Sequence, residues 1–203
     1  MLRRFVIVLI AISIMGCPGG GDKAKGRFKP VLKDAEEVLS DLKSAEDTLN
    51  KLLLNQSVEG AEGKTCAGLI ELDALNLKLD AVRKKIDELK PDDMPMTSEI
   101  LQTGLDPNTG QPILETTYVI DWGKVTGDEQ RIWANMHNLH SALFTSLKAA
   151  EVACQCIESN DKKSLFCNII AMQMPEGKLS LEIESIEKVQ IVPIHELLEK
   201  SKP

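Results

Sequence analysis

Apolar residues recur at alternating spacings of three and four between residues 30 and 54. They are Val31, Ala35, Val38, Leu42, Ala45, Leu49 and Leu52, and most positions between them are Lys, Asp or Glu. This is the a/d pattern of a heptad repeat, so it predicts an amphipathic helix with a narrow apolar seam. Pro30 suits the first turn of such a helix, and the glycines of NQSVEGAEGKT end the pattern.

Two further stripes of the same kind follow. The first consists of Leu72, Leu75, Leu79, Val82, Ile86 and Leu89, and Pro91 ends it. The second begins near Asp128, which suits an N-cap or first-turn position, and consists of Ile132, Met136, Leu139, Leu143, Leu147, Ala150, Cys154 and Ile157. We expect these stripes to pack as an antiparallel three-helix bundle with coiled-coil-like packing.

Residues 91–127, between the second and third helices, have a different pattern. ILQTG and QPILETTYVIDW are rich in Ile, Thr, Tyr and Val, and they flank the turn-forming stretch LDPNTGQP. This predicts an inserted β-hairpin or a long structured loop. The alternation of Asp106, Asn108 and Gly110 also suggests a calcium loop, but Gln111 and Thr117 stand where an EF-hand has Gly and Glu.

The C-terminal part contains shorter patterns. SLFCNIIAMQMPEG predicts a short helix that Pro175 and Gly177 stop. Apolar and polar residues then alternate over residues 179–183, which predicts a strand and an edge partner for the hairpin, before a short helix at HELLEK. The expected fold is therefore mainly α: a three-helix bundle with a small β element, as one domain over residues 30–203.

The first seventeen residues have the layout of a secretory signal. Arg3 and Arg4 precede an apolar run over residues 5–15, which is too short to span a bilayer as a stable helix but suits a signal-peptide core. The run ends in Ile-Met-Gly-Cys at residues 14–17. This stretch resembles the lipobox of bacterial lipoproteins, although Met15 stands where that family usually has a small or polar residue.

The resemblance implies that residues 1–16 are cleaved and that Cys17 becomes the lipidated N-terminus, with palmitate-type acyl chains. Residues 17–29, with PGGGDKAKG, would form a flexible tether to the membrane. Two or three acyl chains anchor stably, whereas one is marginal. The resemblance places the protein outside the cytoplasm. Pro18, rather than Asp, then points to the outer membrane in a Gram-negative cell, and otherwise the chain would lie on the outer face of the cell membrane.

The charge of the chain narrows the range of partners. Without Arg3 and Arg4, 22 of the 24 basic residues remain against 31 acidic ones, so the net charge is −9, and aromatic residues are only 3% of the chain. An acidic chain with few stacking rings has no basic patch for phosphates, so we expect no nucleic-acid partner.

Four cysteines remain beside Cys17, namely Cys66, Cys154, Cys156 and Cys167. Their spacings do not match the CxxC pairs of zinc sites or redox centres, and four thiols outside the cytoplasm are expected to form two disulfides. Cys66 stands at the start of the second helix, and Cys154 and Cys156 stand at the end of the third. In an antiparallel bundle these two helix ends are neighbours. We therefore favour Cys66–Cys154 with Cys156–Cys167 over the swapped pairing, and a Cys154–Cys156 bridge is the least favoured.

The remaining candidate chemistry lies on the third helix and just before it. His137 and His140, three residues apart, can share a helix face and bind a metal together with an acid. Trp122 and Trp133 are interpreted as anchors that pack the hairpin onto the bundle, with ligand contact as the alternative. His195 has no visible partner. No nucleophile, P-loop, dinucleotide or zinc-protease motif is found, so we predict no catalytic residue, no metal and no cofactor.

The prediction is a lipid-anchored cell-envelope protein with a non-catalytic structural or adaptor role. It binds the membrane through its lipid anchor and a further envelope protein through its helical surface. The alternative is an extracytoplasmic lipoprotein that binds a small ligand or a metal, with Trp122, Trp133, His137 and His140 lining the site.

Overall fold

The computed structural model describes residues 25–105, 111–159, 163–172, 174 and 177–200. The predicted signal peptide and Cys17 lie outside the described residues. So do Asp106, Asn108 and Gly110, which the sequence suggested as part of a calcium loop. The described elements are α2 (Phe28–Leu53), α3 (Cys66–Leu69), α4 (Leu72–Glu88), β1 (Met96–Leu105), β2 (Pro112–Ile120), η1 (Trp122–Lys124), α5 (Asp128–Glu158), α6 (Leu165–Met172), α7 (Ile183–Ile186), η2 (Glu187–Ile191) and α8 (Val192–Glu199). The protein is mainly helical, with one small antiparallel sheet.

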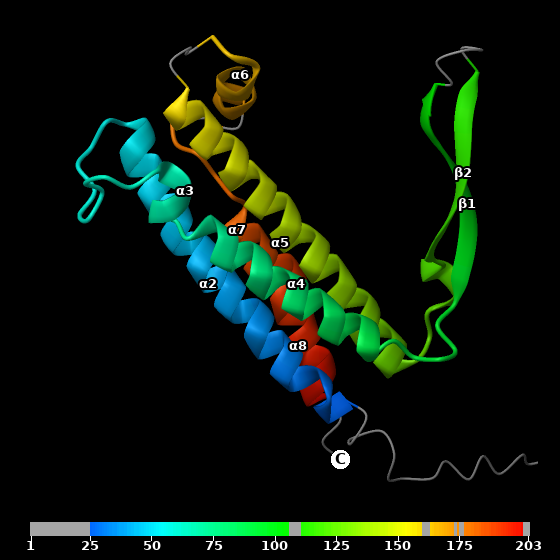
Figure 1. Ribbon diagram of the computed structural model, residues 1–203. Coiled ribbons are helices and arrows are strands. Elements are labelled where there is room, and N and C mark those ends of the chain that lie inside the picture. The colour runs from blue at the N-terminus through cyan, green and yellow to red at the C-terminus, as the bar shows by residue number, and fades with distance from the viewer. Residues whose placement is uncertain (1–24, 106–110, 160–162, 173, 175–176, 201–203) are drawn as a thin grey trace, which may run out of the picture.

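The three predicted long helices are present and pack against one another. Helices α2 and α5 run in the same direction, and α4 runs antiparallel to both (Figure 1). The apolar stripes are the buried faces: every predicted a/d residue of α5 from Ile132 to Cys154 is buried, and the ends of the stripes, at Leu52, Leu72, Leu89 and Ile157, are partly buried. The heptad pattern therefore identified the core faces of all three helices.

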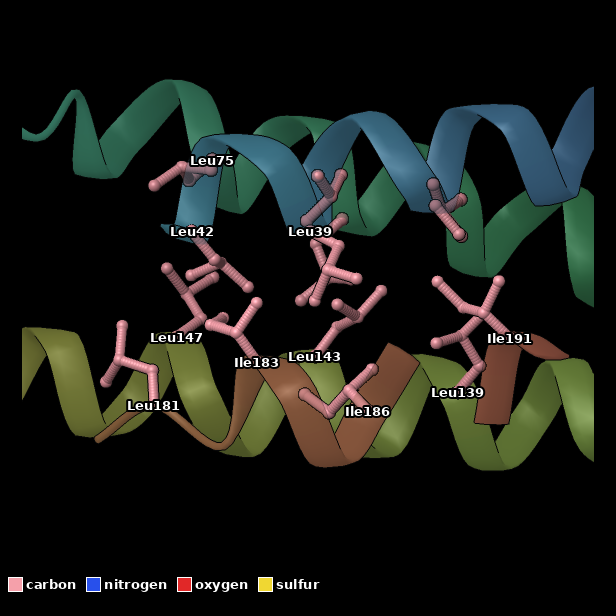
Figure 2. Close-up of a cluster of buried hydrophobic side chains, with 14 of the residues drawn as sticks. Leu39, Leu42, Leu75, Leu139, Leu143, Leu147, Leu181, Ile183, Ile186 and Ile191 are labelled. Carbon is pink, nitrogen blue, oxygen red and sulfur yellow. The ribbon is translucent and has the colours of Figure 1, made fainter. Parts of the chain in front are cut away.

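A fourth helical layer completes the core. Helices α7 and α8, joined by the π-helical turn η2, form a continuous rod that contacts α5 and, through α7, also contacts α2. Figure 2 shows side chains of this rod pointing toward those of α2 and α5. Ile183, Ile186 and Ile191 are buried there, and each fully buried side chain of this size contributes about 1.5–3 kcal/mol.

The strand predicted over residues 179–183 is wrong. Leu179, Leu181 and Ile183 are buried, whereas Ser180 and Glu182 are exposed, so the alternation is that of an extended segment. Its backbone bonds to helix side chains instead of a strand: Leu179 N donates to Asn50 Oδ1 (2.8 Å), and Leu181 N donates to Glu46 Oε2 (2.6 Å). The segment thus crosses the bundle into α7 and is no partner of the hairpin.

The β-hairpin predicted within residues 91–127 is confirmed. Strands β1 and β2 pair antiparallel from Met96↔Ile120 to Leu105↔Pro112, with an irregularity between Gln102 and Gly104. The hairpin stands away from the helices along most of its length (Figure 1). Met96 and Ile120, at its base, pack partly against the core.

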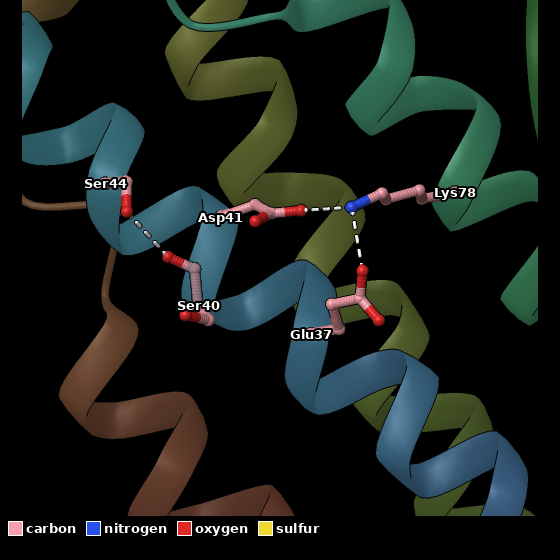
Figure 3. A network of polar contacts seen from close by, with 5 residues as sticks. All are labelled: Glu37, Ser40, Asp41, Ser44 and Lys78. Carbon is pink, nitrogen blue, oxygen red and sulfur yellow. Dashed lines mark hydrogen bonds and ion pairs between the residues drawn. The ribbon is translucent and has the colours of Figure 1, made fainter.

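Ion pairs between α4 and α2 align the two helices. Lys78 on α4 lies between two carboxylates of α2, with Nζ 2.7 Å from Asp41 Oδ2 and 3.0 Å from Glu37 Oε1 (Figure 3). The hydrogen bonds that Lys78 donates to Asp41 and, next in size, to Glu37 raise the pKa of Lys78 above its ordinary value. Lys85 repeats the contact further along, 2.6 Å from Asp34. These pairs are solvent-exposed, so they specify the register of the helices more than they stabilise them.

Candidate functional site

Two disulfides gather at the end of α5. Cys66 of α3 is bonded to Cys154, and Cys167 of α6 is bonded to Cys156. This is the pairing favoured from the sequence. The first bridge joins residues 88 positions apart and the second joins residues 11 apart. We call this pair the disulfide clamp, since it ties α3 and α6 to the same turn of α5.

Helix α6 exposes most of its apolar side chains. Leu165, Phe166, Ile169 and Met172 are exposed, Met172 at 84%, whereas Ile170 is buried. We call these four exposed side chains the α6 face. The sequence predicted a short helix here but did not predict its exposure, because an apolar run of this length is typical of a core helix. The Cys156–Cys167 bond and the buried Ile170 hold α6 on α5 and leave the rest of its apolar surface in solvent.

The α6 face continues into a groove between α5 and the C-terminal rod. The groove has a volume of about 520 Å³ and is lined mostly by small and apolar side chains. Its members are Ala142, Thr145, Ser146, Ala149, Met172, Ser180, Leu181, Glu182, Ser185, Ile186, Val189 and Gln190. Met172 belongs to both surfaces, and Val189 adds an exposed apolar side chain on the far wall. The combined surface is concave, apolar and large enough to take a side-chain row of another protein.

A smaller hollow of about 320 Å³ lies between α4 and α5 and brings two predicted site residues together. His137, His140 and Arg83 line it, with Ile86 and Phe144 among the apolar walls. Burial, followed by the nearby Arg83 and His137, lowers the pKa of His140 below its ordinary value. Half-buried and uncharged near neutral pH, this imidazole can accept or donate one hydrogen bond to a ligand.

The two tryptophans do not converge on that hollow. Trp133 is buried, and its Nε1 donates a hydrogen bond to Ile86 O (2.8 Å), a carbonyl in the last turn of α4. Its ring lies 5.5 Å from that of His137. Trp122, on η1, is 48% exposed. The interpretation of both as anchors of the hairpin is therefore corrected: Trp133 joins α5 to α4, and Trp122 remains at the surface.

Two further polar side chains have structural partners. Ser141, the neighbour of His140 in the sequence, donates from Oγ to the backbone carbonyl of His137, so it is not aimed at a histidine ring. His195, for which the sequence identifies no partner, has Nε2 2.6 Å from Glu36 Oε1 on α2. Within the described part of the chain, no three His, Cys, Asp or Glu side chains converge to hold a metal ion.

Two global findings complete the description of the molecule. Over the described residues, no helix combines the length and the apolar character that crossing a bilayer requires. Comparisons of the chain with protein-family models, with curated proteins and with solved structures found no match.

Proposed function

We propose that the protein is a lipid-anchored cell-envelope protein with a non-catalytic adaptor role. In this proposal Cys17 carries the lipid, and the three-helix bundle of α2, α4 and α5, with coiled-coil-like packing, is a rigid spacer. The α6 face and its groove bind another envelope protein. The lipid anchor rests on the lipobox resemblance of residues 14–17, and the partner-binding role rests on the exposed apolar surface of α6.

The exposure of α6 is the observation that carries the adaptor role. Leaving a Leu, Ile, Phe or Met side chain in water forgoes about 1.5–3 kcal/mol relative to burying it. Four such side chains on one short helix, beside an apolar groove, form the kind of contiguous patch that marks a protein-binding site. A covalent bond holds this helix in place, which is consistent with a surface that must stay ordered before its partner arrives.

The position of the α6 face fits an anchored spacer. The N-terminal end of α2 and helix α6 lie at opposite ends of the bundle (Figure 1). Helix α2 has 26 residues, so it spans about 39 Å at 1.5 Å per residue. A lipid on Cys17 would hold the first end near the bilayer, and the second end could reach a partner beyond the membrane surface.

Photo-crosslinking in intact cells tests the adaptor role. A photoreactive amino acid replaces Met172 in the full chain, and a matched variant carries it at Lys43, an exposed position on α2. We expect a discrete protein adduct, identified by mass spectrometry, at Met172 and none at Lys43. Equal adducts at both positions, or adducts with lipid alone at Met172, would contradict the proposal.

The small-ligand role has one supporting feature, the hollow with Arg83, His137 and His140. Its lining combines the Arg83 guanidinium and two imidazoles with the Asp87 carboxylate and apolar walls, so it suits a small polar ligand that has an acidic group and an apolar body. Native mass spectrometry of the full chain purified from its own membranes would show a copurifying small acid. A loss of that acid in Arg83→Gln, with the α6 crosslink unchanged, would favour this second role.

A further inference from the structure

Strand β2 presents an open edge and an exposed apolar face. Ile100, Leu114 and Tyr118 are all exposed, Tyr118 at 72%. Ile100 is paired with Thr116, and Leu114 and Tyr118 stand two residues on either side of Thr116, so the alternation of a strand puts the three apolar side chains on one face. In the described part of the chain the sheet contains β1 and β2 alone, so no third strand covers the outer edge of either.

A further strand would stabilise this hairpin. A two-stranded hairpin is at best marginally stable in water, and sheets gain independent stability with three or more strands that share an apolar face. Open edges are usually protected by charges or bulges. Each strand has one charged residue, Glu99 in β1 and Glu115 in β2, and β1 also has the irregularity at Gln102–Gly104. The one proline of β2, Pro112, stands at its first position, so the regular edge from Leu114 to Ile120 is the less protected one.

We propose that β2 pairs antiparallel with β2 of a second copy of this chain, centred on Thr116. Thr116 is the middle residue of the strand Pro112–Ile120, so this register uses its full length. In it, Leu114 of each copy lies opposite Tyr118 of the other, and Glu115 lies opposite Thr117. An aromatic residue opposite an aliphatic one on the same face is a favourable cross-strand pair. The product is a four-stranded sheet with Ile100, Leu114 and Tyr118 of both copies on one face.

The neighbouring symmetric registers are less favourable. Centring on Glu115 places the two Glu115 carboxylates opposite each other, which is repulsive. Centring on Thr117 brings Leu114 opposite Ile120, and Ile120 already packs against the helical core. Because the hairpin stands away from the helices, antiparallel pairing about Thr116 also keeps the two bundles at opposite ends of the joined sheet (Figure 1). This second contact is separate from the α6 face and goes beyond the adaptor role.

A cysteine at the centre of the pairing provides the test. In an antiparallel pair, residues directly opposite each other have Cα atoms about 4.5–5.5 Å apart, within the range that a disulfide spans. The full chain with Thr116→Cys should form a disulfide-linked dimer in cells, seen on a non-reducing gel. Ser98→Cys is the matched control: it is also exposed but lies on β1. Its two copies stand three strand spacings apart across the sheet and four residues apart along it, or about 20 Å.

Charge-swapped copies then test the register. One tagged chain carries Leu114→Lys and Tyr118→Lys with Thr116→Cys, and another carries Leu114→Glu and Tyr118→Glu with Thr116→Cys. Each of these chains expressed alone should form about tenfold less disulfide-linked dimer than Thr116→Cys, since like charges then face each other. Coexpression of the two chains should restore a mixed dimer. The proposal is overturned if Thr116→Cys gives no more dimer than Ser98→Cys, if coexpression restores nothing, or if Thr116→Cys instead links to a different protein. Retained helicity shows that the bundle is intact in every variant.

Discussion

Asn50 supplies both hydrogen bonds that a neighbouring strand would give to Leu179. Its Nδ2 donates to Leu179 O (2.9 Å), and its Oδ1 accepts from Leu179 N (2.8 Å). Two residues on, Ser146 Oγ of α5 donates to Leu181 O (2.7 Å). Side chains of α2 and α5 thus satisfy the backbone of the extended segment and align the rod that follows it.

Asn50→Ala should therefore destabilise the protein. Two partly buried backbone groups of Leu179 lose their partner, and we expect a loss of about 1–3 kcal/mol in the free energy of unfolding, measured by urea titration. Asn168→Ala is the control. The exposed Asn168 side chain makes a long contact of 3.4 Å to Lys163 O, so its removal should change the value by less than about 0.5 kcal/mol. Equal effects from both variants would contradict the role of Asn50.

His140 should make the stability depend on pH. Burial and the charges of Arg83 and His137 lower its pKa, although Asp87 and Asp80 act in the opposite direction. The unfolded chain therefore takes up the proton first as the pH falls. The contribution of neutral His140 is complete above the ordinary pKa of about 6.5 and is lost as the pH falls toward the folded value.

The test compares urea titrations at neutral and mildly acidic pH. The wild-type chain should lose more stability on acidification than His140→Asn, which has no proton to take up at that position. Arg83→Gln should fall between the two, because it removes one cause of the lowered pKa and leaves the burial. If His140→Asn has the same pH dependence as the wild type, the shift of His140 does not contribute.

At the scale of elements, the disulfide clamp makes two contributions of different size. In the chain-entropy description, closing a loop of 88 residues stabilises by about 4–5 kcal/mol, and closing one of 11 residues by about 3 kcal/mol. The first bridge fixes the packing of α3 and α4 against α5, whereas the second holds only α6.

Removal of each bridge should therefore have a distinct result. Replacing Cys66 and Cys154 by Ala should lower the unfolding free energy of the whole bundle by several kcal/mol, about 4–5 by the loop-entropy relation. Replacing Cys156 and Cys167 by Ser should cost less and should increase hydrogen exchange selectively in α6. Uniform loss of protection in the second variant would show that α6 supports the bundle core, which the exposed α6 face does not suggest.

The sequence predicted elements best where one periodicity had one structural meaning. The heptads of α2, α4 and α5 have no strand equivalent, so their core faces and the neighbouring positions of Cys66 and Cys154 could be inferred. Alternation over residues 179–183 has two meanings, because an extended segment bonded by side chains alternates as a strand does. Its true partners, Glu46 and Asn50, lie more than a hundred residues away, and nothing local identifies them.

The candidate site was predicted less well than the fold for a related reason. The prediction that His137 and His140 lie close together is confirmed, because residues three apart on a helix share a face. The exposure of α6 depends on how a short apolar helix sits on α5, which is set by one disulfide and by Ile170. Composition favours burial for such a run, so the α6 face could not be inferred before the packing was known.

At the scale of the whole molecule, the two ends of the bundle differ in chemistry. Near the start of α2, exposed ion pairs join Lys25 to Asp128 (2.5 Å) and Arg27 to Glu129 (2.5 Å), and the hydrogen bond from Lys25 lowers the pKa of Asp128. The opposite end carries the disulfide clamp and the α6 face. If Cys17 carries the proposed lipid, the charged end would lie near the membrane and the apolar end away from it, which would suit the proposed adaptor role.

The lipid anchor can be tested separately from the fold. Cys17→Ala in the full chain should move the protein from the membrane fraction to the soluble extracytoplasmic fraction, because the acyl chains that would anchor it can no longer be attached. Both disulfides should still form, because they join residues of the bundle alone. Pro18→Ala, which keeps the lipobox cysteine, is the control and should remain with the membrane. If Cys17→Ala stays in a salt-washed membrane pellet while Met172 still crosslinks to its partner, the protein is held by that partner, and the lipid is not its anchor.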